Sequence, residues 1–206
     1  MKSNQKYVNK SLRLKNYNYN YPGSYFITIC IKDRKCSFGE IKHGEMQLNN
    51  TGIIARYCWA DIPNHFMHVE LGPNIVMPNH VHGIITLCDQ IYSPYHEEAF
   101  ENTKNILHAK TIKMHKRLPT IIGSYKAAVS KQVNNMYPEL NFKWQTSYYD
   151  HIIRNEKALI YISEYILNNP IMWEKDLENV NFAGNLPPTK VKQLQQIFYK
   201  KLFSFK

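Results

Sequence analysis

The stretch VELGPNIVMPNHVHGIITL, residues 69–87, decides the fold that we expect for this chain. Its two halves, up to Val76 and from His80 onward, are rich in β-branched and apolar residues, and Pro78-Asn79 between them is a turn signal. The pattern predicts two strands joined by a tight turn. Because side chains alternate along a strand, His80 and His82 point to the same side of the second one.

Working outward from this pair, the same kinds of signal predict the other elements. Strands are expected at 25–31, 35–41 and 147–153. Helices are expected from Thr51, as N-cap, to near Pro63, and at 118–136 and 156–169. Asn155 caps the start of the last helix, and Pro170 marks its end. Without the short strand at 35–41, the main elements follow the order strand, helix, strand, strand, helix, strand, helix, which is typical of an α+β plait, an antiparallel sheet with helices packed against one face.

Composition narrows the class of partner. The chain has 206 residues, 44% of them hydrophobic, which excludes wholesale disorder and suits one domain with extensions. Lys+Arg 26 against Asp+Glu 16 gives a net charge of +10, which favours a polyanion such as nucleic acid. The 15 tyrosines suit base stacking, and they suit core and rim positions equally well.

Cysteine spacing and hydropathy argue against other classes. None of the four cysteines forms C-x-x-C, which argues against a zinc ribbon, and no apolar run approaches the ~18 residues of a membrane span. The first ten residues are polar and contain no hydrophobic signal region. We therefore expect a cytoplasmic protein without a membrane partner.

Two groups of residues suggest a metal site. His80 and His82 can converge on one ion but need a third ligand from elsewhere, and Gly83 after them would let a backbone or ligand approach closely. Tyr161, Tyr165 and Asn169 fall on one side of the 156–169 helix, where an asparagine oxygen can bind Mg²⁺ or Mn²⁺. Taken alone, the same residues favour partly exposed histidines, core tyrosines and a C-terminal helix cap over a metal site.

Several motifs together resemble the REP-associated tyrosine transposases, within the insertion-sequence single-tyrosine HUH transposase family. They are RLK at 13–15, PGSYFIT at 22–28, FGE at 38–40, MPNHVHGI at 77–84, GSYK at 123–126, WQ at 144–145, YYDHIIRN at 148–155 and YILNNP at 165–170. The resemblance covers about residues 11–175, and residues 89–118 fall where family members vary.

This resemblance implies a ferredoxin-like (RRM-like) plait of the HUH endonuclease type. It implies a metal-dependent single-stranded DNA endonuclease and strand transferase that forms a 5′-phosphotyrosine intermediate at repetitive palindromic (REP-like) hairpins. By position, His80, His82 and Asn169 would bind Mg²⁺ or Mn²⁺, and Tyr165 would be the nucleophile, with Tyr161 as the second choice. Metal binding by neutral histidines is expected to fail at acid pH.

Further expectations concern organisation and DNA contacts. We divide the chain into a basic arm (1–20), a transposase-like HUH domain (21–175, with a variable insertion at about 89–118) and a C-terminal extension (176–206) that contains an amphipathic stretch. Contacts to the DNA backbone are predicted for Arg13, Lys15, Lys126 and Arg154. The protein would act near the nucleoid as a monomer or homodimer. The alternative is a non-catalytic plait that only binds single-stranded nucleic acid.

Overall fold

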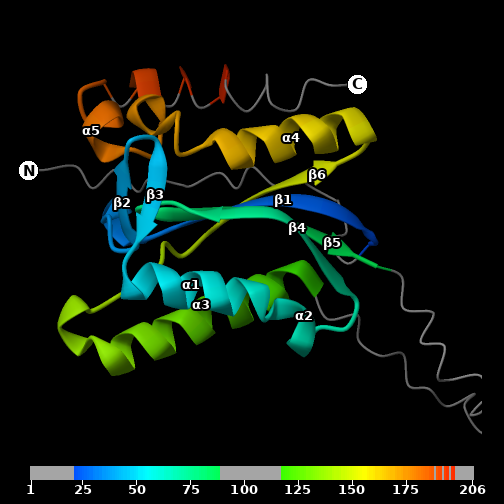
Figure 1. Cartoon of the computed structure of the whole chain (residues 1–206). Helices are drawn as coiled ribbons and strands as arrows, with labels where there is room; N and C mark the ends of the chain where they lie inside the picture. Colours follow the sequence, from blue (N-terminus) through cyan, green and yellow to red (C-terminus); the bar gives the residue numbers. More distant parts are fainter. Residues whose placement is uncertain (1–20, 89–116, 188, 192, 195, 198–206) are drawn as a thin grey trace, which may run out of the picture.

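A four-stranded antiparallel sheet runs through the middle of the molecule in the computed structural model (Figure 1). The structure describes residues 21–88, 117–187, 189–191, 193–194 and 196–197. The strands of this sheet are β1 (Gly23–Cys30), β4 (Val69–Val76), β5 (His80–Leu87) and β6 (Tyr149–Ile153), in the spatial order β4-β5-β1-β6. β5 and β1 are therefore the two central strands.

Helices cover both faces of the sheet (Figure 1). α1 (Asn50–Ala60) and α3 (Arg117–Met136) lie on one face, and α4 (Glu156–Asn168) lies on the other. The smaller elements are η1 (Lys32–Arg34), the hairpin β2 (Gly39–Lys42) and β3 (Glu45–Leu48), α2 (Ile62–His65), η4 (Pro138–Leu140), η5 (Trp173–Lys175) and α5 (Val180–Ala183).

The connectivity is that of a ferredoxin-like plait, so the predicted fold class is confirmed, although helices were expected on one face of the sheet and α4 covers the other. The chain runs β1, α1, β4, β5, α3, β6, and the second βαβ half interleaves with the first in the order β4-β5-β1-β6. α4 follows the complete plait and packs against the face that α1 and α3 leave open. This added helix carries the residues predicted to be catalytic.

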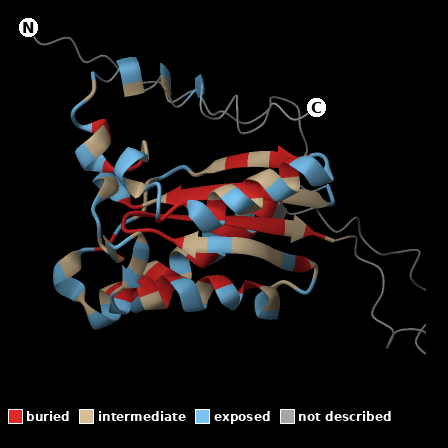
Figure 2. Cartoon of the chain, turned by 45° about the horizontal axis from the view of Figure 1, so that its top comes forward, coloured by how far each residue is buried: buried red, intermediate tan, exposed pale blue. Residues whose placement is uncertain are grey.

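Two hydrophobic cores lie on the two faces of the sheet. Along β1, Tyr25, Ile27 and Ile29 belong to the core under α1 and α3, whereas Phe26 belongs to the core under α4. This alternation follows from the pleat of a strand, and Figure 2 shows the central strands largely buried. The α4 core also contains Ile84, Ile153, Ala158, Ile162 and Ile166.

Local signals placed most elements correctly. The strands Val69–Val76 and His80–Leu87 are confirmed as predicted, and the Asn155 side chain accepts the Ala158 N–H at 2.8 Å as the cap of α4. The N-cap of α1 is Asn49 rather than Thr51, because the Asn49 side chain accepts the Gly52 N–H at 3.0 Å.

Two other local predictions were wrong. The strand expected at 35–41 is instead the β2–β3 hairpin, which begins at Gly39 and turns at His43 and Gly44, both with positive φ. Gly83 serves packing rather than ligand access: a Cβ there would lie 2.2 Å from Cζ2 of Trp59, on the α1 side of the sheet.

Several predictions fall on residues outside those described. They concern the basic arm 1–20 with Arg13 and Lys15, positions 89–116 of the insertion, and much of the final amphipathic stretch. The division of the chain into arm, domain and extension stays a prediction. Among the helices that the structure describes, none combines the length and apolar character needed to cross a membrane.

Candidate metal centre and active site

His80 and His82 lie side by side on the α4 face of β5. Their ring centroids are 4.4 Å apart, and the two residues are 0% and 1% exposed. The pair is therefore not the partly exposed one that the residues alone also allowed. Burial lowers the pKa of His80 well below its usual value and that of His82 to about 3, so both rings are neutral at neutral pH.

The hydrogen bonds of Asn79 determine which nitrogen of His80 carries the proton. The Asn79 Nδ2 group donates to the carbonyl oxygens of Arg34 at 3.2 Å and Glu178 at 2.8 Å, so Oδ1 is the acceptor side of the amide. His80 Nδ1 lies 2.8 Å from this Oδ1 and must donate to it. A neutral ring has one N–H, so the lone pair of His80 is on Nε2.

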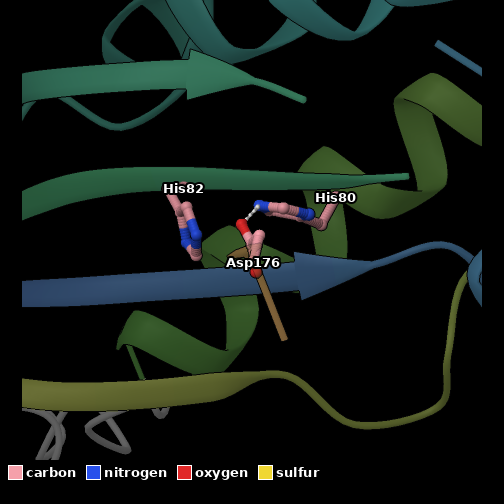
Figure 3. Close-up of side chains that lie close together, drawn as sticks. All are labelled: His80, His82 and Asp176. Carbon is pink, nitrogen blue, oxygen red and sulfur yellow. Dashed lines mark ion pairs between the residues drawn. The ribbon is translucent and has the colours of Figure 1, made fainter. Parts of the chain in front are cut away.

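Asp176 faces that lone pair from a segment that follows α4. Its Oδ2 lies 3.9 Å from His80 Nε2, and the ligand atoms of His80, His82 and Asp176 all lie within 4.8 Å of one another (Figure 3). Burial raises the pKa of Asp176 to about 7, and the nearby Glu178 carboxylate adds to the rise. We call residues 173–179 the strap, since they bring this carboxylate across the sheet face.

His82 connects the metal centre to α4. Its Nδ1 lies 2.9 Å from the Thr28 hydroxyl oxygen, and its Nε2 lies 3.1 Å from the Tyr165 hydroxyl oxygen. Phe26 stacks on the same imidazole with ring centroids 5.3 Å apart. These contacts hold the His82 ring with its Nε2 toward Tyr165 on α4.

Tyr165 and Asn169 lie one turn apart on the same side of α4, as their spacing predicted, and the tertiary structure brings both side chains to the site. Asn169 is 2% exposed, and its side chain hydrogen-bonds Tyr165, which lowers the phenol pKa. Burial is the larger effect and, with the Asp176 charge, raises the pKa of Tyr165 well above its usual value. Tyr161 packs against the same hydrophobic core one turn earlier.

The donor set fits a divalent cation. Three buried atoms, His80 Nε2, Asn169 Oδ1 and Asp176 Oδ2, have no hydrogen-bond partner among the described residues. All three present lone pairs, and only a cation or added protons would satisfy them together. Two imidazoles with carboxylate and amide oxygens suit a first-row ion such as Mn²⁺ better than Mg²⁺, which prefers oxygen ligands alone.

Asp176 is the functional candidate that the sequence reasoning missed. It belongs to no recognisable motif, and it lies in the part of the chain assigned to the C-terminal extension. The one signal near it is the end of α4 at the Asn-Pro pair, after which the chain is free to turn back over the sheet.

The residues predicted to contact DNA have different surroundings. Lys126 Nζ donates to the backbone oxygens of Gln145 at 2.6 Å and Thr146 at 3.2 Å, so two of its three N–H groups are engaged within the protein. Arg154 is exposed between β6 and α4. The DNA contacts of these two residues stay predictions, as do those of Arg13 and Lys15.

Comparison with known proteins gives one clear relative. A Haemophilus influenzae protein described as uncharacterized is 40% identical over 167 residues, which is 81% of this chain and 91% of that protein. This chain belongs to the same family as that protein. No protein-family model matches it.

Two solved structures are distantly similar. One is a REP-associated tyrosine transposase bound to a REP hairpin, with 18% identity, 77% of this chain and 72% of that chain covered, and a TM-score of 0.49. The other is a proposed transposase from Deinococcus radiodurans, with 18% identity, 76% and 97% covered, and a TM-score of 0.43.

Proposed function

We propose that this protein is a metal-dependent single-stranded DNA endonuclease and strand transferase in which Tyr165 is the nucleophile. The observation that carries the proposal is the 3.1 Å contact between the Tyr165 hydroxyl and His82 Nε2, beside the unsatisfied acceptors of His80 and Asp176. A structural core has no need of several buried lone pairs without donors, because each one destabilises the fold.

Two imidazoles and the Asp176 carboxylate would hold the metal ion, with Asn169 Oδ1 available as a further ligand. When bound, the ion would polarise a phosphodiester and neutralise charge that develops on its oxygens. The motif resemblance favours single-stranded DNA with a palindromic hairpin as substrate, and the net charge of +10 suits such a polyanion.

The protein groups account for the nucleophile. Tyr165 releases its proton to solvent, and its oxygen attacks phosphorus, forming a phosphotyrosine bond as the bond to the 3′-oxygen breaks; that oxygen takes up a proton from solvent. Burial raises the pKa of the phenol, and the hydrogen bond from Asn169 opposes part of this rise by favouring the phenolate. The 3′-hydroxyl of another strand can reverse this step, which joins strands without an external energy source.

The experiment is covalent trapping. A labelled single-stranded oligonucleotide carrying a palindromic hairpin is incubated with the protein and Mn²⁺ or Mg²⁺, and adducts are separated in denaturing gels. We expect an adduct with the wild type and with Tyr161→Phe, and none with Tyr165→Phe. An adduct that persists in Tyr165→Phe but disappears in Tyr161→Phe would transfer the nucleophile to Tyr161. DNA binding without any adduct, insensitive to His82→Ala, would favour a purely binding plait.

A further inference from the structure

Asn79 forms hydrogen bonds both to the His80 ring and to the strap that carries Asp176. It is 0% exposed in the turn between β4 and β5, next to His80 in the chain. The side chain of Asn79 makes three hydrogen bonds: one to the His80 ring, one to the Arg34 carbonyl and one to the Glu178 carbonyl. No other described side chain contacts both the His80 ring and the strap through hydrogen bonds that the structure shows.

The first bond selects the tautomer of His80. Without an acceptor at Nδ1, the proton of the neutral ring can move to Nε2, where the Asp176 carboxylate lies 3.9 Å away. A hydrogen bond between these two groups would satisfy both and would occupy the atoms that a metal ion needs. By accepting from Nδ1, the Asn79 oxygen keeps Nε2 free.

The second bond holds the strap. The Glu178 carbonyl that accepts from Asn79 lies two residues after Asp176, and the Glu178 N–H donates to Asp176 Oδ1 at 2.7 Å. Glu178 therefore links the Asn79 side chain to the Asp176 carboxylate through its own carbonyl and N–H groups. Arg34 supplies separate tethers, donating to the Leu177 carbonyl at 2.8 Å and pairing with the Glu178 carboxylate at 3.1 Å.

We infer that Asn79 is a positioning residue that keeps His80 in its Nδ1–H tautomer and fixes the strap so that Asp176 faces the same ion. This inference rests on the metal site of the proposed function. Asn79 itself touches neither the ion nor the substrate. Its effect is exerted through His80 Nε2 on one side and Asp176 Oδ2 on the other.

The two roles can be separated by substitution. Asn79→Asp keeps an acceptor for His80 Nδ1 but loses the donors to the Arg34 and Glu178 carbonyls, so the tautomer should persist while the strap loosens. Asn79→Ala removes both functions. Arg34→Gln is the matched control, because it weakens the other tethers of the strap and leaves the His80 contact intact.

The test measures the tautomer and the metal affinity independently. Long-range ¹H–¹⁵N spectra of the metal-free full-length protein report which His80 nitrogen is protonated, and calorimetric titration with Mn²⁺ gives the dissociation constant. We expect the Nδ1–H form in the wild type, in Arg34→Gln and in Asn79→Asp, and loss of that form in Asn79→Ala. Mn²⁺ affinity should fall by about 10–100-fold in Asn79→Ala and less in Arg34→Gln.

An Nε2–H tautomer of His80 in the wild type would overturn the inference, even if no Asn79 variant folds. So would Mn²⁺ affinity within twofold of the wild type in a folded Asn79→Ala protein. Failure of the wild type to bind Mn²⁺ or Mg²⁺ would instead overturn the metal site of the proposed function, and the metal-free spectra would still decide whether Asn79 sets the tautomer.

Discussion

The Tyr165 hydroxyl lies 3.1 Å from Nε2 of His82, the ring nitrogen that the Thr28 contact at Nδ1 leaves to bind a metal ion. One ring nitrogen cannot bind a metal ion and share a hydrogen bond with a phenol at the same time. Whichever of the two atoms carries the proton, metal binding must break this contact and release the hydroxyl. The nucleophile and the ion are therefore coupled through a single atom.

Tyr165→Phe should for this reason strengthen metal binding while it abolishes the DNA adduct. The lost hydrogen bond is worth about 0.5–1.5 kcal/mol, so Mn²⁺ affinity should rise by roughly 2–10-fold. Calorimetric titration measures the change, with Tyr161→Phe as the control that should leave affinity unchanged. Weaker Mn²⁺ binding by Tyr165→Phe would show that the phenol supports the site rather than competing for it.

Asp176→Asn should make the metal-free protein more stable and should weaken its stabilisation by a metal ion. Burial raises the pKa of this carboxyl to about 7, so the folded state binds its proton more tightly than the unfolded chain does. Its contribution to stability is therefore full at low pH and is lost as the pH rises from about 4 to about 7.

We accordingly expect metal-free Asp176→Asn to be more stable than the wild type at pH 7.5, by about 1–3 kcal/mol in urea unfolding. The difference in the free energy of unfolding between the two proteins should disappear toward pH 4. Added Mn²⁺ should stabilise the wild type far more than the variant. Equal stability of the two metal-free proteins at pH 7.5 would contradict the burial of an unpaired carboxylate.

Metal affinity should depend on pH through Asp176 rather than through the histidines. Protons compete with the ion for the carboxylate below its pKa of about 7, whereas burial lowers the pKa of His82 to about 3. The charged groups facing Asp176 are the Glu178 carboxylate, which raises its pKa, and the Arg34 guanidinium, which lowers it.

The apparent Mn²⁺ affinity of the wild type should therefore fall by about tenfold per pH unit between pH 7 and pH 5. In Asp176→Asn the affinity, lower at every pH, should be nearly flat over the same range. Titrations at several pH values check this. A parallel decline in both proteins would assign the pH dependence to the imidazoles.

Gly83→Ala should damage the fold without altering the ligand set. The new Cβ would lie 2.2 Å from the Trp59 ring, on the face of the sheet opposite to His80 and His82. Overpacking of this kind destabilises by about 1–3 kcal/mol. Gly123→Ala is the matched control: nothing lies within 4 Å of its Cβ, and alanine should stabilise this exposed position of α3 by about 0.5–1 kcal/mol.

Urea denaturation of both glycine variants checks this expectation, and Mn²⁺ titration of folded Gly83→Ala should give the wild-type dissociation constant. An unchanged unfolding midpoint for Gly83→Ala would mean that Trp59 can move aside. A changed metal affinity would mean that the packing of Trp59 against β5 affects the positions of the imidazoles.

Local periodicity accounts for what could be predicted about the site. Two histidines one residue apart share a face of β5 because side chains alternate, and Tyr165 and Asn169 share a face of α4 because a turn has 3.6 residues. Both statements hold whatever the rest of the chain does. They do not decide whether the two faces meet, and the residues alone favoured partly exposed histidines and core tyrosines.

Local patterns in the sequence predicted the α+β plait and the two short-range pairs of site residues, because hydrophobic alternation, caps and turn residues act over a few positions. The burial of the imidazoles, the position of Asp176 beside them and the hydrogen bonds of Asn79 to His80 and the strap follow only from the three-dimensional arrangement of the chain. These contacts link residues nearly a hundred positions apart along the chain. No local pattern encodes such a meeting, since it depends on how the chain returns over the sheet after α4.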